Sequence, residues 1–483
     1  MNLPQLSFRE QTFILVLIFF LSGLLTILTF EWTWILLPFA LLFGYLLMPV
    51  FFFPLPSLFF LLCISIPFST EWSITPTLGI DFPDEPLMIF ISMVVLLYCM
   101  VQPARFPAIL LSSNLFTIVL LQLGWIAITC FYSYEPLLSL KYLLAKIWYI
   151  IPFVILPVYF IRTPQHWKTW AACWLVPMAI LVVQVLIRHS VHGFSFYSIR
   201  TAMPPFFRNH VNYSALLTLL IPFSFAGWYL TQSDSRLKKI LLIGLCIGIA
   251  GWVFAYSRGA WVALFCAIGM VVIVKRKWML PVLFATVCTL LISICWLVTE
   301  RNYLKFIPEH DQTYFHTEFR LHMQATFEGK DVSTAERWHR WVAGFRMIAA
   351  EPVTGFGPNS FYLQYKPYTL RRFQTWVSNN PEHSTVHNYF LLLALEQGLI
   401  GLFLFLFLVC GMFISLQQYY HQLQSRFFRT ICLAVAASLT IAMVLNLMSD
   451  LIEADKVGPI FYSCLAATLL LRQQVIKEKT IVT

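Results

Sequence analysis

The sequence contains few charged residues: only 11% of its 483 positions are Asp, Glu, Lys or Arg, whereas 59% are hydrophobic. A soluble domain carries about 25% charged residues, so this shortage excludes an ordinary soluble enzyme. Acidic residues are scarcer still, since 22 Asp and Glu face 32 Lys and Arg and leave a formal net charge of +10. Many apolar runs approach the roughly 20 residues that cross a bilayer. We therefore predict an all-α polytopic membrane protein.

The sequence also lacks a recognisable metal or disulfide pattern. All eleven cysteines fall within or beside apolar stretches, where a thiol packs as a small hydrophobic group. Acidic residues do not form a convincing metal cluster in the outer loops. The nearest grouping, Asp450, Glu453 and Asp455, is interpreted as a short outer turn. We expect no metal and no other cofactor.

About twelve to fourteen transmembrane helices are predicted from the apolar segments, some of which are short or interrupted by proline. The segments lie near residues 12–30, 33–53, 55–68, 87–101, 108–131, 147–161, 167–187, 210–231, 239–256, 259–274, 279–298, 387–415, 430–449 and 458–472. The first exceeds the apolar region of a signal peptide, so we expect a retained span. Three regions follow: N-terminal transmembrane helices (1–298), a large, mostly helical outer loop (299–386), and C-terminal transmembrane helices with a short cytoplasmic tail (387–483).

Basic residues predict the orientation of the chain. Lys and Arg cluster in short loops at 236–239, 275–277 and 426–429, which the positive-inside rule assigns to the cytoplasm. Both termini are then expected in the cytoplasm, and the large loop lies outside. The loop at 188–210 breaks the rule because it is expected outside yet contains three arginines, including Arg208. These arginines indicate either an anionic ligand or contacts with water and lipid headgroups.

The large loop contains a predicted amphipathic helix. Ser333 and Glu336 have the spacing of a capping box, apolar residues follow at helical spacing, and Pro352 ends the pattern. On this helix Arg337 and Arg340 lie three residues apart and share a face. That pair suits an anion clamp, although a solvated basic face has the same pattern.

A histidine and a further arginine are the other candidate functional residues. His387 opens the apolar segment after the loop, where a neutral imidazole either accepts a proton from a hydroxyl or only caps the helix. Arg258 lies between two apolar runs near the outer membrane surface, which indicates a functional site unless the side chain reaches lipid headgroups. Its planar guanidinium suits phosphate. Arg258, Arg337 and His387 together suit transfer from a lipid-linked pyrophosphate.

The chain resembles the superfamily of O-antigen ligases and polymerases, which build bacterial envelope glycans. The resemblance covers about the C-terminal half, from Arg208 to Gly401, whereas the N-terminal spans are similar only in hydropathy. The stretches that carry it are Tyr256-Ser-Arg-Gly-Ala-Trp261, Ser333-Thr-Ala-Glu-Arg-Trp338, Pro352-Val-Thr-Gly-Phe-Gly357, His387-Asn-Tyr-Phe-Leu and Glu396-Gln-Gly-Leu-Ile-Gly401.

This resemblance implies a metal-independent glycosyltransferase with a GT-C-like membrane fold. It implies an undecaprenyl pyrophosphate-linked glycan as donor and an active site at the periplasmic face of the bacterial inner membrane. Arg258 and Arg337 match the arginines implied to bind the pyrophosphate, and His387 matches the histidine implied to activate the acceptor hydroxyl. The auxiliary candidates are Arg208, Arg340 and Asn388.

Several functions remain compatible with these residues. The leading hypothesis is ligation of a glycan to a lipid A core or a similar acceptor, with inversion at the anomeric carbon. Polymerisation, in which a second carrier-linked glycan is the acceptor, shares the donor and the fold. A non-enzymatic anion or lipid transporter predicts charges spread through several spans at mid-membrane depth, whereas these charges cluster at one face. A peptidoglycan polymerase is a further alternative. The acidic catalytic residue that such an enzyme usually has in its large outer loop is not identifiable in this sequence. The expected partners are lipids and glycans, and we expect no nucleic acid partner.

Overall fold

The structure, a computed structural model, describes residues 55–75, 78–101, 107–307, 332–375, 378–380 and 383–482. The chain divides into two units, residues 1–59 and residues 60–483. Only residues 55–59 of the first unit are described, so the predicted spans at 12–30 and 33–53 lie outside the described residues.

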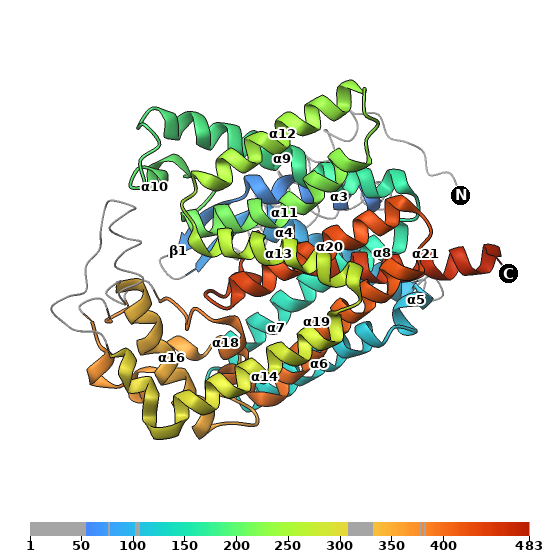
Figure 1. Ribbon diagram of the computed structural model, residues 1–483. Helices are drawn as coiled ribbons and strands as arrows, with labels where there is room; N and C mark the ends of the chain where they lie inside the picture. Colours follow the sequence, from blue (N-terminus) through green and yellow to red (C-terminus); the bar gives the residue numbers. More distant parts are fainter. Residues whose placement is uncertain are drawn as a thin grey trace, which may run out of the picture. The chain divides into compact units, whose positions relative to one another are not determined.

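Helices make up most of the described chain (Figure 1). The first half contains α3 (Leu55–Phe68), α4 (Asp84–Val101), α5 (Ala108–Leu111), α6 (Asn114–Phe131), α7 (Pro136–Ile150), the π-helical turn η3 (Ile151–Ile155), α8 (Leu156–Phe160), α9 (Pro164–Ser190), α10 (Ile199–Ala202) and α11 (His210–Leu230). The second half contains α12 (Arg236–Val253), α13 (Arg258–Arg276), α14 (Met279–Val298), η4 (Thr299–Phe306), α16 (Val332–Ala350), α17 (Phe361–Gln364), η6 (Lys366–Tyr368), η7 (Arg371–Phe373), α18 (Tyr389–Glu396), α19 (Gly398–Gln422), α20 (Arg426–Asn446), η8 (Leu451–Glu453) and α21 (Gly458–Val482).

The prediction of an all-α polytopic membrane protein is confirmed. Among the described residues, eight helical segments are long and apolar enough to cross a membrane: α6, the continuous run α7–η3–α8, α9, α11, α13, α14, α19 and α20. Helix α20 packs against α11, α13, α19 and α21 and so forms much of the core of the second unit. The count of twelve to fourteen helices stays a prediction, because part of the chain is not described.

One predicted apolar segment, residues 387–415, is broken into two helices. Helix α18 ends at Glu396 and α19 begins at Gly398. Gly398 has a φ of +69°, and a Cβ atom there would lie 1.9 Å from the carbonyl oxygen of Val353. Only glycine combines this left-handed backbone with such a close approach. An isolated glycine in an apolar run does not reveal the break from sequence.

A small antiparallel hairpin is a second feature that the sequence analysis does not predict. Strands β1 (Thr70–Thr75) and β2 (Leu78–Phe82) pair within the acidic loop before α4, and Glu71 lies directly opposite Asp81. Two like charges opposite each other are destabilising. Arg208 relieves this repulsion, because its guanidinium lies 2.8 Å from Oε2 of Glu71 and 3.6 Å from Oδ2 of Asp81.

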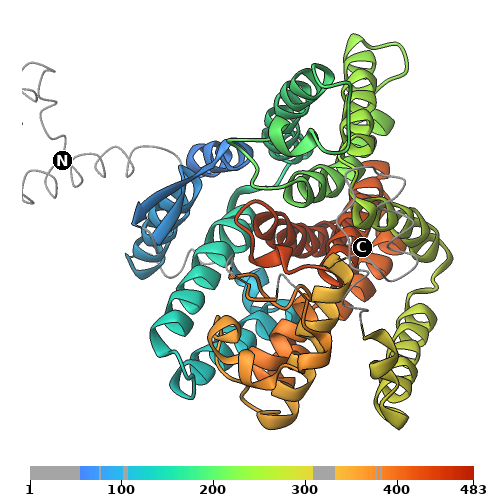
Figure 2. The ribbon, with the colours of Figure 1, turned by 90° about the vertical axis from the view of Figure 1, so that its left-hand side faces the viewer.

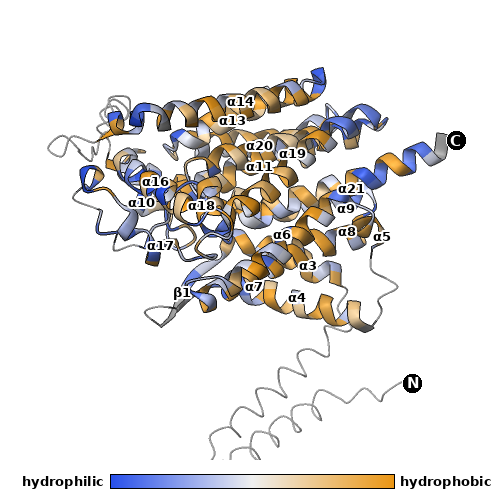
Figure 3. Cartoon of the chain, turned by 90° about the horizontal axis from the view of Figure 1, so that it is seen from below, coloured by the Kyte–Doolittle hydropathy of each residue, from blue (hydrophilic) through white to orange (hydrophobic). Residues whose placement is uncertain are grey.

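The loops predicted to be cytoplasmic gather at one end of the helices, which we call the basic end (residues 162–168, 236–239, 275–277, 426–429 and 472–479). Four contacts connect residues in or near these loops: His421 Nε2 to the Val274 carbonyl (3.0 Å), the Gln424 N–H to Glu478 Oε2 (2.6 Å), the Trp167 ring to the Phe428 ring (6.3 Å), and the Arg426 guanidinium over the Tyr229 ring (4.6 Å). Figure 3 shows hydrophilic residues at both ends of the helices and apolar residues between them. Figures 1 and 3 place α16 at the end opposite the C-terminal turn of α21.

Candidate functional site

Helix α16 carries both predicted loop arginines and is fixed by a buried glutamate. The carboxylate of Glu336 accepts hydrogen bonds from the hydroxyls of Thr375 and Ser378, and its Oε2 lies 3.4 Å from an Arg340 nitrogen. The predicted capping box is therefore wrong in its detail. The helix begins at Val332, and Glu336 binds the later part of the loop instead of the helix start.

Two side chains of α16 hold the chain segment that leads to His387. An Arg340 nitrogen donates to the carbonyl oxygen of Thr385 (3.2 Å), and Trp341 Nε1 donates to that of Val386 (3.1 Å). Arg340 is only 6% exposed. Consecutive carbonyls are thus bound by consecutive residues of one helix, which places the arginine-bearing face of α16 beside His387. Figure 2 looks onto the end of the molecule that carries α16.

His387 is held in an unusual backbone conformation with a partly open side chain. Its φ of +52° is uncommon for a residue with a side chain, and its N–H donates to Thr385 Oγ1 (3.3 Å). The side chain is 36% exposed, and Nδ1 lies 3.9 Å from Oδ1 of Asp450. Burial, and then the positive charges of Arg340 and Arg337, lower the pKa of His387 to about 3. The imidazole is therefore neutral at physiological pH, as a proton acceptor must be.

Asp450 was not predicted as a site residue. It lies between α20 and η8, and burial raises its pKa, while a hydrogen bond with the Thr385 side chain acts in the opposite direction. Two hydrogen bonds tie this segment to the start of α18: Tyr389 N–H to the Ser449 carbonyl (3.0 Å) and Asn388 Nδ2 to the Leu447 carbonyl (3.0 Å). Asp450 therefore faces His387 because two distant segments are joined, and the local sequence carries no signal of that contact.

Asn388 has a structural role in the described contacts. Its Oδ1 accepts a hydrogen bond from the Leu391 N–H (3.0 Å) and so caps α18, while its Nδ2 binds the Leu447 carbonyl. Both ends of the amide are thus used within the protein. The auxiliary binding role predicted for Asn388 remains a prediction that these contacts do not favour.

A second buried network fixes the segment that carries Asp450. Lys146 on α7 binds both carboxylate oxygens of Glu453 at 2.7 and 2.8 Å, and the Tyr142 hydroxyl donates to Glu453 Oε1 at 2.9 Å. Gln397, at the break between α18 and α19, donates to the Tyr142 hydroxyl at 3.2 Å. The residues interpreted as a short outer turn thus do form a turn, but its Glu453 is an internal ion-pair partner.

Arg258 occupies the first position of helix α13. The next residue, Gly259, lies against the end of α20: a Cβ atom there would be 3.8 Å from Leu445 Cδ2. The start of α13 therefore lies against the end of α20, and Asp450, which faces His387, follows that end of α20 by a few residues.

A turn at the end of α16 locks the large loop onto the helices. Phe356 N–H donates to the Leu395 carbonyl and Gly357 N–H to the Glu396 carbonyl, both at 2.9 Å. The Glu396 carboxylate accepts from the backbone N–H groups of Asn359 (2.8 Å) and Phe361 (3.1 Å). The turn that contains Gly355 and Gly357 therefore docks on the Glu396-Gln-Gly398 element at the α18–α19 break.

Arg208 lies in a different environment from the other candidates. Its contacts are the hairpin carboxylates Glu71 and Asp81, and its side chain is 60% exposed. Arg188, in the same loop, donates to the Pro204 carbonyl. Both arginines therefore have partners within the protein. The auxiliary role of Arg208 remains a prediction.

The described residues contain no group of three or more His, Cys, Asp or Glu side chains that could hold a metal ion. The candidate site instead consists of cationic and titratable groups: Arg337 and Arg340 on α16, Arg258 at the start of α13, His387 before α18, and Asp450 after α20. Fixed guanidiniums beside a neutral imidazole can bind a diphosphate and accept a proton from a hydroxyl.

Comparison with known protein families finds a match in the middle of the chain. Residues 243–406 match the family model for O-antigen ligase, and this segment contains Arg258, Arg337, Arg340 and His387, while Arg208 and Asp450 lie outside it. No curated protein matches the chain. The segment that holds most of the candidate site is therefore similar to O-antigen ligases, and this match covers about a third of the chain.

Proposed function

We propose that this membrane protein transfers a glycan from an undecaprenyl pyrophosphate carrier to a hydroxyl of a lipid A core or a similar surface acceptor. The match of residues 243–406 to the O-antigen ligase family model supports a glycan-transferring membrane enzyme. The observation that carries the finer proposal is the placement of a neutral His387 beside Arg337 and Arg340. The start of α13, where Arg258 lies, packs against the end of α20.

The arginines act on the leaving group. As the bond between the anomeric carbon and the phosphate oxygen breaks, negative charge develops on the pyrophosphate, and fixed guanidiniums stabilise it without reorganisation. Arg340 is positioned before the donor binds, because Thr385 and Glu336 hold it. The charge stabilisation required by the reaction is therefore available from side chains, and we propose a metal-independent reaction.

His387 acts on the nucleophile. Since Nδ1 faces Asp450, Nε2 is the nitrogen that takes the proton of the acceptor hydroxyl while the oxygen attacks the anomeric carbon. The Asp450 carboxylate favours the imidazolium formed in this step. Attack opposite the departing pyrophosphate inverts the anomeric configuration. We propose that this happens at the periplasmic face of the inner membrane, because the site lies at the end opposite the basic end.

Transfer by the purified protein tests the proposal. Wild type and His387→Ala are incubated in nanodiscs with undecaprenyl pyrophosphate-linked glycan, EDTA, and either lipid A core or a second carrier-linked glycan. General-base catalysis is worth about 10²–10⁴-fold, and a loss of this size is expected for His387→Ala. His192→Ala, at an exposed histidine outside the site, is the matched control and should retain activity.

The products separate the alternatives. Glycan on the lipid A core in the presence of EDTA supports ligation, whereas a ladder of longer carrier-linked glycans would identify a polymerase. Transfer that requires a divalent cation would contradict the metal-independent mechanism. Intact donor with neither product would favour the transporter hypothesis.

A further inference from the structure

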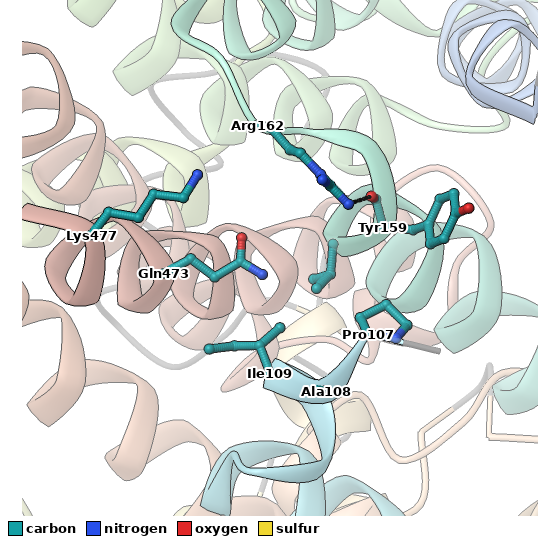
Figure 4. A pocket seen from close by; sticks show the side chains of 8 residues that line it. Pro107, Ala108, Ile109, Tyr159, Arg162, Gln473 and Lys477 are labelled. Atoms are coloured by element: carbon teal, nitrogen blue, oxygen red, sulfur yellow. Dashed lines mark hydrogen bonds between the residues drawn. The ribbon is translucent and has the colours of Figure 1, made fainter. Parts of the chain in front are cut away.

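A pocket with two cationic side chains opens at the basic end, far from the candidate active site. Its volume is about 280 Å³, near the lower limit of the roughly 300–1,000 Å³ typical of small-molecule sites. Figure 4 shows Arg162, Gln473 and Lys477 around it. The lining comes from the start of α5, the end of α8 and the last turns of α21, and consists of Pro107, Ala108, Ile109, Val158, Tyr159, Arg162, Gln473 and Lys477.

The cations of this pocket are not neutralised by neighbouring acids. None of the eight lining residues is a carboxylate. The next residue on α21, Glu478, is used elsewhere, because its Oε2 accepts a hydrogen bond from the Gln424 N–H at 2.6 Å. The guanidinium of Arg162 makes a long hydrogen bond of 3.4 Å to the Tyr159 carbonyl, and Lys477 has no ion pair among the described residues. The pocket therefore has two positive charges available for an anion.

One wall of the pocket is apolar and polar groups line the other. Pro107, Ile109 and Val158 supply the apolar surface, while Gln473 offers an amide between the two cations. The Tyr159 hydroxyl is 3.0 Å from that of Tyr98 on α4. A free inorganic anion would use only the polar side. A phospholipid headgroup uses both, since its phosphodiester is anionic and its glycerol and first methylenes are apolar.

We propose that this pocket binds the phosphodiester headgroup of an anionic phospholipid, with Arg162 and Lys477 on the phosphate oxygens. A guanidinium binds two phosphate oxygens at once, and an ammonium adds a point charge. Basic pockets between helices at the cytoplasmic surface are suited to anionic lipids, which are abundant in that leaflet. The site is separate from the proposed glycan transfer and does not depend on it.

Native mass spectrometry of the full-length protein released from nanodiscs tests this inference. The nanodiscs contain phosphatidylcholine alone or with phosphatidylglycerol, and retained lipids are counted. Wild type is expected to retain phosphatidylglycerol in preference to phosphatidylcholine. The double variant Arg162→Gln/Lys477→Gln should bind phosphatidylglycerol about tenfold or more weakly, because each basic residue contributes a factor of about five.

A second pair of basic residues provides the matched control. Lys239→Gln/Lys275→Gln removes the same charge from exposed positions at the basic end that do not line the pocket, and it should leave the retained lipid unchanged. Equal losses in both double variants would overturn the proposal, because they would indicate general electrostatic attraction. Displacement of the retained lipid by millimolar inorganic phosphate would also overturn it, in favour of a soluble phosphate site. If the double variant unfolds, Lys477→Gln alone is tested on the same criterion.

Discussion

At the scale of single residues, Asp450 is the group whose role follows most directly from geometry. Its carboxylate lies 3.9 Å from Nδ1 of His387, and in the proposed mechanism it stabilises the imidazolium that forms when the acceptor hydroxyl is deprotonated. We expect Asp450→Asn to lower kcat by about tenfold or more while KM for the carrier-linked donor stays within about twofold. Initial transfer rates measured over a range of donor concentrations check this.

An equivalent substitution far from the site controls for the loss of a charge. Asp234→Asn changes an exposed aspartate in the loop before α12 and should leave both constants unchanged. A rise in KM with unchanged kcat in Asp450→Asn would contradict the assigned role, because it would show that Asp450 affects donor binding and not the chemical step.

The pH dependence of transfer follows from the charges around His387. Burial and the guanidiniums of Arg340 and Arg337 lower its pKa to about 3, so the free enzyme keeps a neutral imidazole below pH 6.5, where an ordinary histidine becomes protonated. We expect kcat/KM to remain level down to about pH 5 on this account. Arg340→Gln removes a positive charge, which raises the pKa of His387 and moves the acid limb to higher pH.

The conservative variant Arg340→Lys distinguishes the effect of the positive charge on the His387 pKa from the effect of the lost hydrogen bond. Arg340→Lys retains the positive charge and should leave the acid limb near its wild-type position, even if the lost hydrogen bond to Thr385 lowers the overall rate. An acid limb near pH 6.5 in the wild type would contradict a depressed histidine pKa.

At the scale of elements, the α18–α19 break determines where α16 lies. Gly398 has a φ of +69°, and its Cα faces the Val353 carbonyl so closely that a methyl group cannot fit. We expect Gly398→Ala to destabilise the protein by roughly 1–2 kcal/mol from backbone strain, with a further penalty from the clash. Because the loop then separates from α18, transfer activity should fall more than the apparent Tm alone explains.

A glycine in an open position is the control for this prediction. A Cβ at Gly269, inside α13, would meet no atom within 4 Å. Gly269→Ala should therefore leave activity unchanged and raise stability slightly, since alanine favours helix by about 1 kcal/mol. Thermal unfolding in detergent and transfer assays on both variants make the comparison. Full activity in Gly398→Ala would show that docking of the loop does not position α16.

What the sequence reveals about this site depends on the distance over which each signal acts. Local patterns predict the apolar helices, the arginines of α16 and the end of α16 before Pro352, because periodicity and helix-stop preferences act within a few residues. The contact of Asp450 with His387 depends on hydrogen bonds between the start of α18 and the end of α20, for which no local pattern exists. The hairpin was missed because two short strands in an acidic loop bury too little surface to leave a clear alternation.

At the scale of the whole molecule, the basic end and the candidate site lie at opposite ends of the helices. The basic end gathers the Lys and Arg of five loops, joined by contacts such as that between Gln424 and Glu478. The opposite end holds the candidate site around His387. The positive-inside rule predicts that the basic end faces the cytoplasm, and the proposed pyrophosphate site would then lie on the other side of the membrane from the basic end.

Labelling of introduced cysteines tests this orientation in the full-length protein. Arg372→Cys lies in an exposed part of the large loop, and Lys277→Cys lies at the exposed turn before α14. In intact spheroplasts a charged, membrane-impermeant maleimide should add label to Arg372→Cys and not to Lys277→Cys, whereas lysed membranes should show both. Wild type gives the background of the eleven native cysteines; its exposed Cys246, Cys266 and Cys295 lie in the apolar helices α12, α13 and α14, where a charged reagent reacts poorly. Labelling of Lys277→Cys in intact spheroplasts would show that the orientation is the opposite of the predicted one. It would then place the His387 site in the cytoplasm, where the proposed periplasmic transfer could not occur.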